Sequence, residues 1–94
     1  MSKRDVYIEK MKTELDAMNA KMDALGAKVK DARDDAQDKY REEMKNVRHQ
    51  SKLAVAKLDE LKAAGEDSWD RVVKEMEKIR DAFTHSFHYF KSQL

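Results

Sequence analysis

Apolar residues recur at every third or fourth position along this chain, from Ile8 to Phe90. This spacing places their side chains on one face of an α-helix. The chain contains no proline, so no ring interrupts the helical pattern. We therefore predict an all-α protein whose apolar face must be covered by another helix, a lipid surface or a partner protein.

Residues 1–64 have the pattern of one long coiled-coil helix. A heptad phase runs from Ile8 to Ala36 and predicts a left-handed supercoil with a partner helix. Gly26 lies within this run, but its neighbours keep the phase. The phase shifts near Ala36, and a weaker heptad pattern then continues to Leu61. The seam residues expected at an interface are Ile8, Met11, Leu15, Met18, Met22, Leu25, Val29, Leu58 and Leu61.

A bend or break of the helix is predicted near Gly65. This glycine suits the residue that follows a helix C-terminus, and Asp67 or Ser68 suits the N-cap of a new helix. The alternative is a helix that continues through Gly65. The whole chain would then be a single rod of about 140 Å, at a rise of about 1.5 Å per residue.

Residues 65–94 are expected to form a shorter amphipathic helix that contains most of the aromatic residues. Large buried aromatic side chains dominate the energy of many interfaces, so this helix is expected either to close the structure or to dock a partner. The two segments form one structural unit and not independent domains. The contact residues expected in the second segment are Trp69, Val72, Met76, Ile79, Phe83, Phe87 and Phe90.

Charged residues make up 41% of the chain, and 20 basic residues against 19 acidic residues give a net charge of +1. The two signs are mixed along the chain, which is typical of solvated helix faces and not of the basic stripe of a nucleic-acid-binding protein. There is no cysteine, and no stretch approaches the ~18 apolar residues of a membrane-spanning helix. With no secretory signal at its start, we expect a cytoplasmic protein, with peripheral membrane contact as the alternative.

No catalytic residue, cofactor or metal ion is expected. His85 and His88 are spaced to reach one metal ion, but no nearby acidic residue or cysteine completes a zinc site on that face. Carboxylates are abundant, yet a helical rod offers no cleft in which burial could tune their pKa values for acid–base chemistry. Motifs for phosphate binding or a nucleophile are absent from the sequence. The pattern therefore favours a protein that is not an enzyme.

Two segments of the chain resemble a family of small, uncharacterised bacterial coiled-coil proteins. The first is the opening Ser2–Asp16, and the second is the Trp-acidic segment Ala64–Asp70. Val72, Val73 and Phe83 also fall where that family places apolar residues in its final amphipathic helix. The resemblance implies a bacterial origin and a helical fold, and it implies no activity.

The leading functional hypothesis is a non-enzymatic coiled-coil interaction or scaffold protein. It would form a homo-oligomer through the N-terminal seam and dock a protein partner through the C-terminal helix. One alternative is a peripheral membrane or lipid-surface protein that binds through the same C-terminal helix. Another is a small helical regulatory subunit that inserts into a larger complex.

Overall fold

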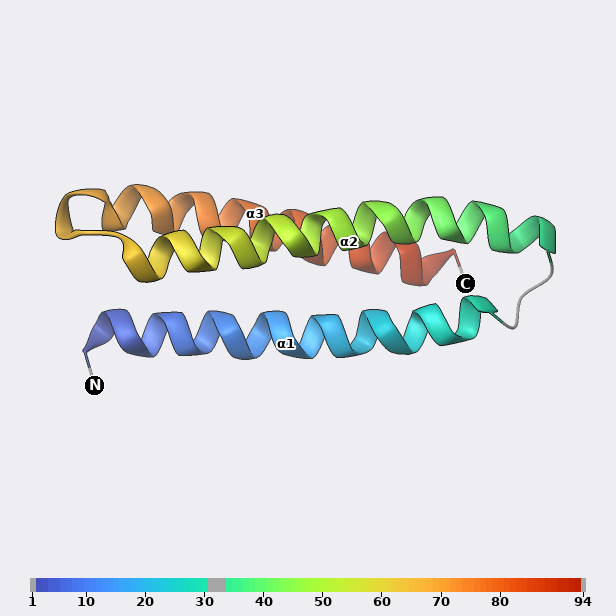
Figure 1. Ribbon diagram of the computed structural model, residues 1–94, viewed down its shortest axis with the longest axis horizontal. Coiled ribbons are helices and arrows are strands. Elements are labelled where there is room, and N and C mark those ends of the chain that lie inside the picture. Colours follow the sequence, from blue (N-terminus) through green and yellow to red (C-terminus); the bar gives the residue numbers. More distant parts are fainter. Residues whose placement is uncertain (1, 31–33, 94) are drawn as a thin grey trace.

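The computed structural model describes residues 2–30 and 34–93, with the exception of the side chains of residues 34–36. Within these ranges the chain forms three helices, α1 (Lys3–Lys30), α2 (Asp34–Ala63) and α3 (Glu66–Ser92), and no strand. The helices lie side by side and alternate in direction, in an elongated bundle of 51 × 21 × 18 Å (Figure 1). The prediction of an all-α protein is confirmed. None of the helices in the described ranges has the length and apolar character needed to cross a bilayer.

The region 1–64 differs from the single long helix that we expected. It contains α1 and α2, which run in opposite directions and pack against each other (Figure 1). The side chain of Ala36, at which the heptad phase shifts, lies outside the described residues. The longest dimension of the bundle is 51 Å, far short of a continuous rod of about 140 Å. Folding back allows the chain to bury its own apolar stripe, which an isolated rod would leave in water.

The connection between α2 and α3 is short. α2 ends at Ala63, and Gly65 is the N-cap of α3 with an extended backbone, φ −80° and ψ 176°. Gly65 therefore lies two residues past the end of α2, its φ is not positive, and it caps α3 in place of Asp67 or Ser68. Asp67 and Ser68 lie inside the first turn of α3, where the N–H of Ser68 donates to the carbonyl oxygen of Gly65 at 3.2 Å.

A single apolar core runs along the bundle and receives side chains from all three helices. α2 lies closest to α3, and α1 packs mainly on α2. Two small residues of α2, Ser51 and Ala54, made the second heptad pattern weak, yet both are buried in this core. The buried apolar residues are Met11, Leu15, Met22, Leu25, Val29, Met44, Val47, Ala54, Leu58, Leu61, Val72, Met76, Phe83, Phe87 and Phe90.

One polar pair bridges α1 and α2 inside the bundle. The hydroxyl of Ser51 lies 2.6 Å from Oδ1 of Asn19, to which it donates a hydrogen bond. In the part of the chain that the structure describes, every buried side-chain nitrogen and oxygen has a hydrogen-bond partner. A directional bond of this kind fixes how far α1 can slide along α2, which apolar contacts alone do not.

We expect Phe83→Ala to lower the free energy of unfolding by about 3–5 kcal/mol, because the side chain is 0% exposed and its removal leaves a cavity. Tyr89→Ala is the matched control, since Tyr89 lies on the same helix and is 54% exposed. Urea unfolding followed by circular dichroism measures both variants. Equal losses of stability would contradict the placement of Phe83 in the core.

Candidate functional site

Every residue that the sequence predicts for an interface lies inside the bundle. Most of these side chains are buried, and Ile8, Met18, Trp69 and Ile79 are partly buried against the same core. The N-terminal seam and the aromatic C-terminal helix were expected to be two separate contact surfaces. The structure brings them together within one chain. Neither surface is exposed to a partner while the bundle is closed.

The large apolar side chains that remain exposed are Val6 on α1, Leu53 and Val55 on α2, and Tyr89 on α3. Leu53 and Val55 are two positions apart on one helix, so they point to different sides. Single exposed apolar residues are normal on a protein surface. They therefore do not by themselves define a docking site.

The start of α1 is held against α3 and the α2–α3 connection by a cluster that we call the N-terminal clamp, formed by Arg4, Tyr7 and Trp69. The Arg4 guanidinium lies 4.5 Å from the centroid of the Trp69 ring, a cation–π contact. Arg4 also donates a hydrogen bond to the carbonyl oxygen of Ala64, a free acceptor just past the end of α2. The Tyr7 ring meets the Trp69 ring edge-on, with centroids 5.9 Å apart.

The N-terminal clamp gives Trp69 a role within the chain. The sequence left open whether the helix of this residue closes the structure or docks a partner, and the Trp69 ring contacts two residues of α1. Sequence reasoning missed Arg4 and Tyr7, because neither lies on the apolar stripe. Their juxtaposition with Trp69 depends on α1 and α3 running in the same direction.

Ion pairs connect the helices along the outside of the bundle. Lys57 on α2 lies 2.8 Å from Glu60 and 2.9 Å from Glu75 on α3. Hydrogen bonds to these two carboxylates raise the pKa of Lys57, and the bond from Lys57 lowers the pKa of Glu75. Arg80 on α3 reaches Glu14 on α1 at 3.5 Å. Ion pairs that are partly exposed, as these are, contribute little to stability.

The two histidines of α3 are both exposed, and the ring of His88 rests against Phe87 with centroids 5.7 Å apart. Among the described residues, no group of three or more histidine, cysteine, aspartate or glutamate side chains is placed to hold a metal ion. His85 instead lines a shallow polar depression of about 440 Å³ between α2 and α3, together with Glu43 and Tyr89.

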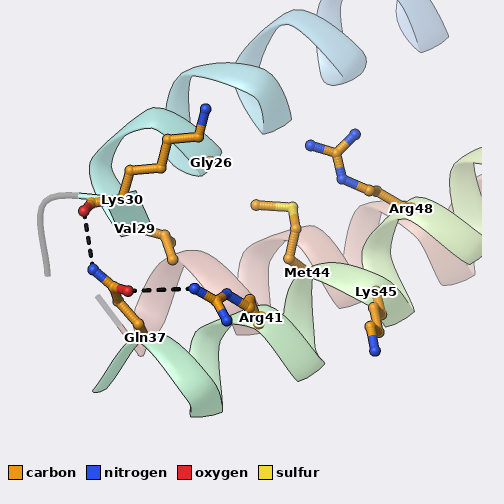
Figure 2. A pocket seen from close by; sticks show the side chains of 8 residues that line it. All are labelled: Gly26, Val29, Lys30, Gln37, Arg41, Met44, Lys45 and Arg48. Carbon is orange, nitrogen blue, oxygen red and sulfur yellow. Dashed lines mark hydrogen bonds between the residues drawn. The ribbon is translucent and has the colours of Figure 1, made fainter. Parts of the chain in front are cut away.

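A larger depression, of about 520 Å³, lies between α1 and α2 near the end of α1, and we call it the α1–α2 pocket (Figure 2). Its base is apolar and its rim carries four cationic side chains. Met44 and Arg48 extend from α2 toward α1, whereas Lys45 extends away from α1 (Figure 2). The lining residues are Gly26, Val29, Lys30, Gln37, Arg41, Met44, Lys45 and Arg48.

Gln37 connects the two helices at the edge of this pocket. Its side-chain amide donates a hydrogen bond to the carbonyl oxygen of Lys30 at 2.9 Å, and Arg41 donates to its Oε1 at 3.5 Å (Figure 2). The bond to Lys30 satisfies a carbonyl at the C-terminus of α1. From the sequence, only Gly26 could have indicated this site, because a glycine is unusual inside a heptad-patterned helix.

Comparison of the chain with protein-family models, with curated proteins and with solved structures gives no match. The resemblance to small bacterial coiled-coil proteins therefore stays a prediction. Functional conclusions rest on the geometry of the bundle.

We expect the stability of the protein to fall as the pH rises from about 10 toward 12, because of Tyr7. Burial and the neighbouring Glu77 carboxylate, 3.3 Å from the phenol oxygen, raise the pKa of Tyr7 from 10.0 to about 12. A raised pKa in the folded state gives a contribution to stability that is complete below the unfolded pKa and is lost as the pH approaches the folded pKa.

Urea unfolding at a series of alkaline pH values measures this loss, and tyrosinate absorbance reports the ionisation directly. Tyr7→Phe is the control and should lack this component of the pH dependence. Identical losses in the wild type and in Tyr7→Phe would contradict the assignment.

We expect Gly26→Ala to raise the free energy of unfolding by up to about 1 kcal/mol, because glycine is unfavourable inside a helix. A Cβ at this position would lie 3.6 Å from Cε of Met44 and 3.7 Å from Nη2 of Arg48, which are ordinary contacts. Gly65→Ala should change stability in the opposite direction, since alanine is a poor N-cap. Thermal unfolding compares the two variants, and a destabilised Gly26→Ala would show that the contacts around Gly26 are tighter than described.

Proposed function

We propose that this chain is a non-enzymatic helical interaction protein that folds by itself and binds a partner protein with its folded outer surface. The observation that carries this proposal is the burial of the heptad seam within one chain. Met11, Leu15 and Leu61 are 1%, 2% and 0% exposed, although no second chain is present. Because the seam is buried, a partner would bind to the charged outer faces of the helices.

The bundle is proposed to pack in the manner of a coiled coil. On α1, Met11, Met18 and Leu25 recur every seven residues, as do Leu15, Met22 and Val29 between them. These are the two positions of a heptad that face a partner helix. In this proposal α2 and α3 take the place of the second chain that the seam was expected to need.

Self-association through the same seam is the alternative that most needs a test. It would require α1 to leave its own bundle and pack on α2 and α3 of another copy, since one set of seam residues cannot cover two surfaces. Exchange of a helix between copies is a known route to dimers. The contacts would be the same in the closed monomer and in the exchanged dimer, so measurement of mass decides between them.

Binding to a membrane surface through α3 is less well supported. The apolar face of α3 would have to reach the lipid, but Phe83 and Phe90 are fully buried in the core. Binding would therefore require the bundle to open and to lose the core contacts of three helices. The basic residues of α3 are also balanced by acidic ones along the same helix, which weakens attraction to anionic lipids.

We expect the wild type to sediment as a folded, elongated monomer of 11.0 kDa. Leu25→Asp should lose about 3–5 kcal/mol of stability, because the new carboxylate would be buried in the core. Ala24→Asp is the matched control. Ala24 is the exposed neighbour of Leu25, so its replacement should cost less than about 1 kcal/mol. Sedimentation velocity at several concentrations, together with circular dichroism, measures mass and folding in the same samples.

A wild-type dimer that Leu25→Asp converts into a folded monomer would overturn the proposal in favour of self-association. A stable monomer in which Leu25→Asp and Ala24→Asp are equally folded would overturn it by a different route. That result would mean that Leu25 is not part of an internal seam.

A further inference from the structure

We propose that the α1–α2 pocket binds a single-chain amphipathic anion of the fatty-acid class. The alkyl chain would lie over Gly26, Val29 and Met44, and the carboxylate would lie against the cationic side chains of the rim. This site is separate from the docking of a partner protein proposed above. Each proposal can fail without the other.

Gly26 is the first argument for a ligand at this position. Its φ is not positive, and a Cβ would meet only ordinary contacts, so neither the backbone nor the packing requires glycine. Glycine inside a helix nevertheless disfavours the helix. What glycine does provide is room for about one methyl group between α1 and the ends of the Met44 and Arg48 side chains, which lie 3.6 Å and 3.7 Å from the position of a Cβ. A residue that disfavours its own helix and brings no structural gain, as Gly26 does in α1, is expected mainly at functional sites.

The base of the pocket suits an alkyl chain. Val29 and Met44 are largely buried in the core, and their accessible edges face the pocket from opposite helices (Figure 2). Methionine is flexible and polarisable, so it adapts to the shape of an apolar ligand. The volume of about 520 Å³ lies within the roughly 300–1,000 Å³ typical of small-molecule sites.

The rim of the pocket suits a carboxylate. Lys30, Arg41 and Arg48 line it together with Lys45, whose side chain extends away from α1, and no acidic residue is among the lining residues that the structure describes. Asp38 lies 3.9 Å from Arg41, but both side chains are largely exposed and the pair is weak. The other three cations form no ion pair with any described carboxylate.

Arg48 is the cation best placed for a head group, because its guanidinium reaches across to α1 (Figure 2). A guanidinium can hold a carboxylate through two parallel hydrogen bonds. Lys30 runs back along α1 (Figure 2). Positive charge beside an apolar base therefore selects an anion with a tail over either an inorganic anion or a neutral hydrocarbon.

A small molecule fits this site better than an acidic protein segment. A stable protein interface buries about 800 Å² on each partner, far more than a pocket formed by eight side chains can provide.

The test is a titration of the isotopically labelled wild-type protein with decanoate below its micelle concentration, followed by the amide signals and the Met44 methyl signal in NMR spectra. We expect saturable shifts centred on Gly26, Val29 and Met44, with a sub-millimolar dissociation constant. Decyltrimethylammonium has the same tail with a cationic head, and acetate has the head group without the tail. Both should bind at least tenfold more weakly.

Two substitutions connect binding to the named residues. Gly26→Leu should fill the pocket and weaken decanoate binding at least tenfold, and Gly26→Ala should weaken it by a smaller factor, because its single methyl group takes up only part of the space. Arg48→Gln should weaken binding about tenfold by removing a charge-assisted hydrogen bond. Arg71→Gln, an exposed arginine on α3, should leave binding unchanged.

Three results would overturn the proposal. The first is the absence of saturable shifts with decanoate. The second is equal binding of decanoate and decyltrimethylammonium, which would mean that the cationic rim selects nothing. The third is shifts spread through the whole core with loss of helicity, which would mean that decanoate acts as a denaturing detergent. The mass of the wild type, measured by sedimentation, tests the proposed function separately and does not depend on decanoate binding.

Discussion

Burial of three apolar stripes against one another is the interaction on which this bundle depends. With 41% charged residues, the chain has few large apolar side chains, and the structure places most of them in one core. Removal of this area from water supplies the main favourable free energy, at about 25 cal/mol per Å². No single helix could bury its stripe alone, so the folding of each helix depends on the other two.

Apolar burial is non-directional, so other contacts must select one arrangement of the helices. The hydrogen bond between Ser51 and Asn19 joins α1 to α2 within the bundle. The N-terminal clamp fixes the start of α1 to the connection between α2 and α3, through Arg4 and Trp69. At the other end, the Tyr40 hydroxyl donates to the carbonyl oxygen of Gln93 at 2.6 Å. These bonds depend on the register of the helices in a way that methionine and leucine contacts do not.

The surface outside the core consists of the outer helix faces and the α1–α2 pocket. The outer faces are charged and carry mixed signs, which suits a folded interaction protein. The α1–α2 pocket is different, because an accessible apolar base lies next to several basic side chains. Gly26 is central to it, since the helix would be more favourable with alanine at this position and the surrounding atoms would accept the extra methyl group. A surface for a protein partner and a pocket for a small anion can coexist, because they use different parts of the molecule.

By itself, the sequence determined that the chain is helical and which side chains are covered. Residues such as Leu15, Met22 and Phe83 were predicted on the apolar face and are buried, because helical periodicity places them there whatever covers the face. Only the tertiary structure decided what covers it. The spacing of a seam is the same for a second chain and for a later segment of the same chain, so periodicity cannot distinguish the two. The N-terminal clamp and the α1–α2 pocket also arise only when the helices are side by side, because each joins residues of different segments, and some of them, such as Arg4 and Arg48, lie off the apolar stripe.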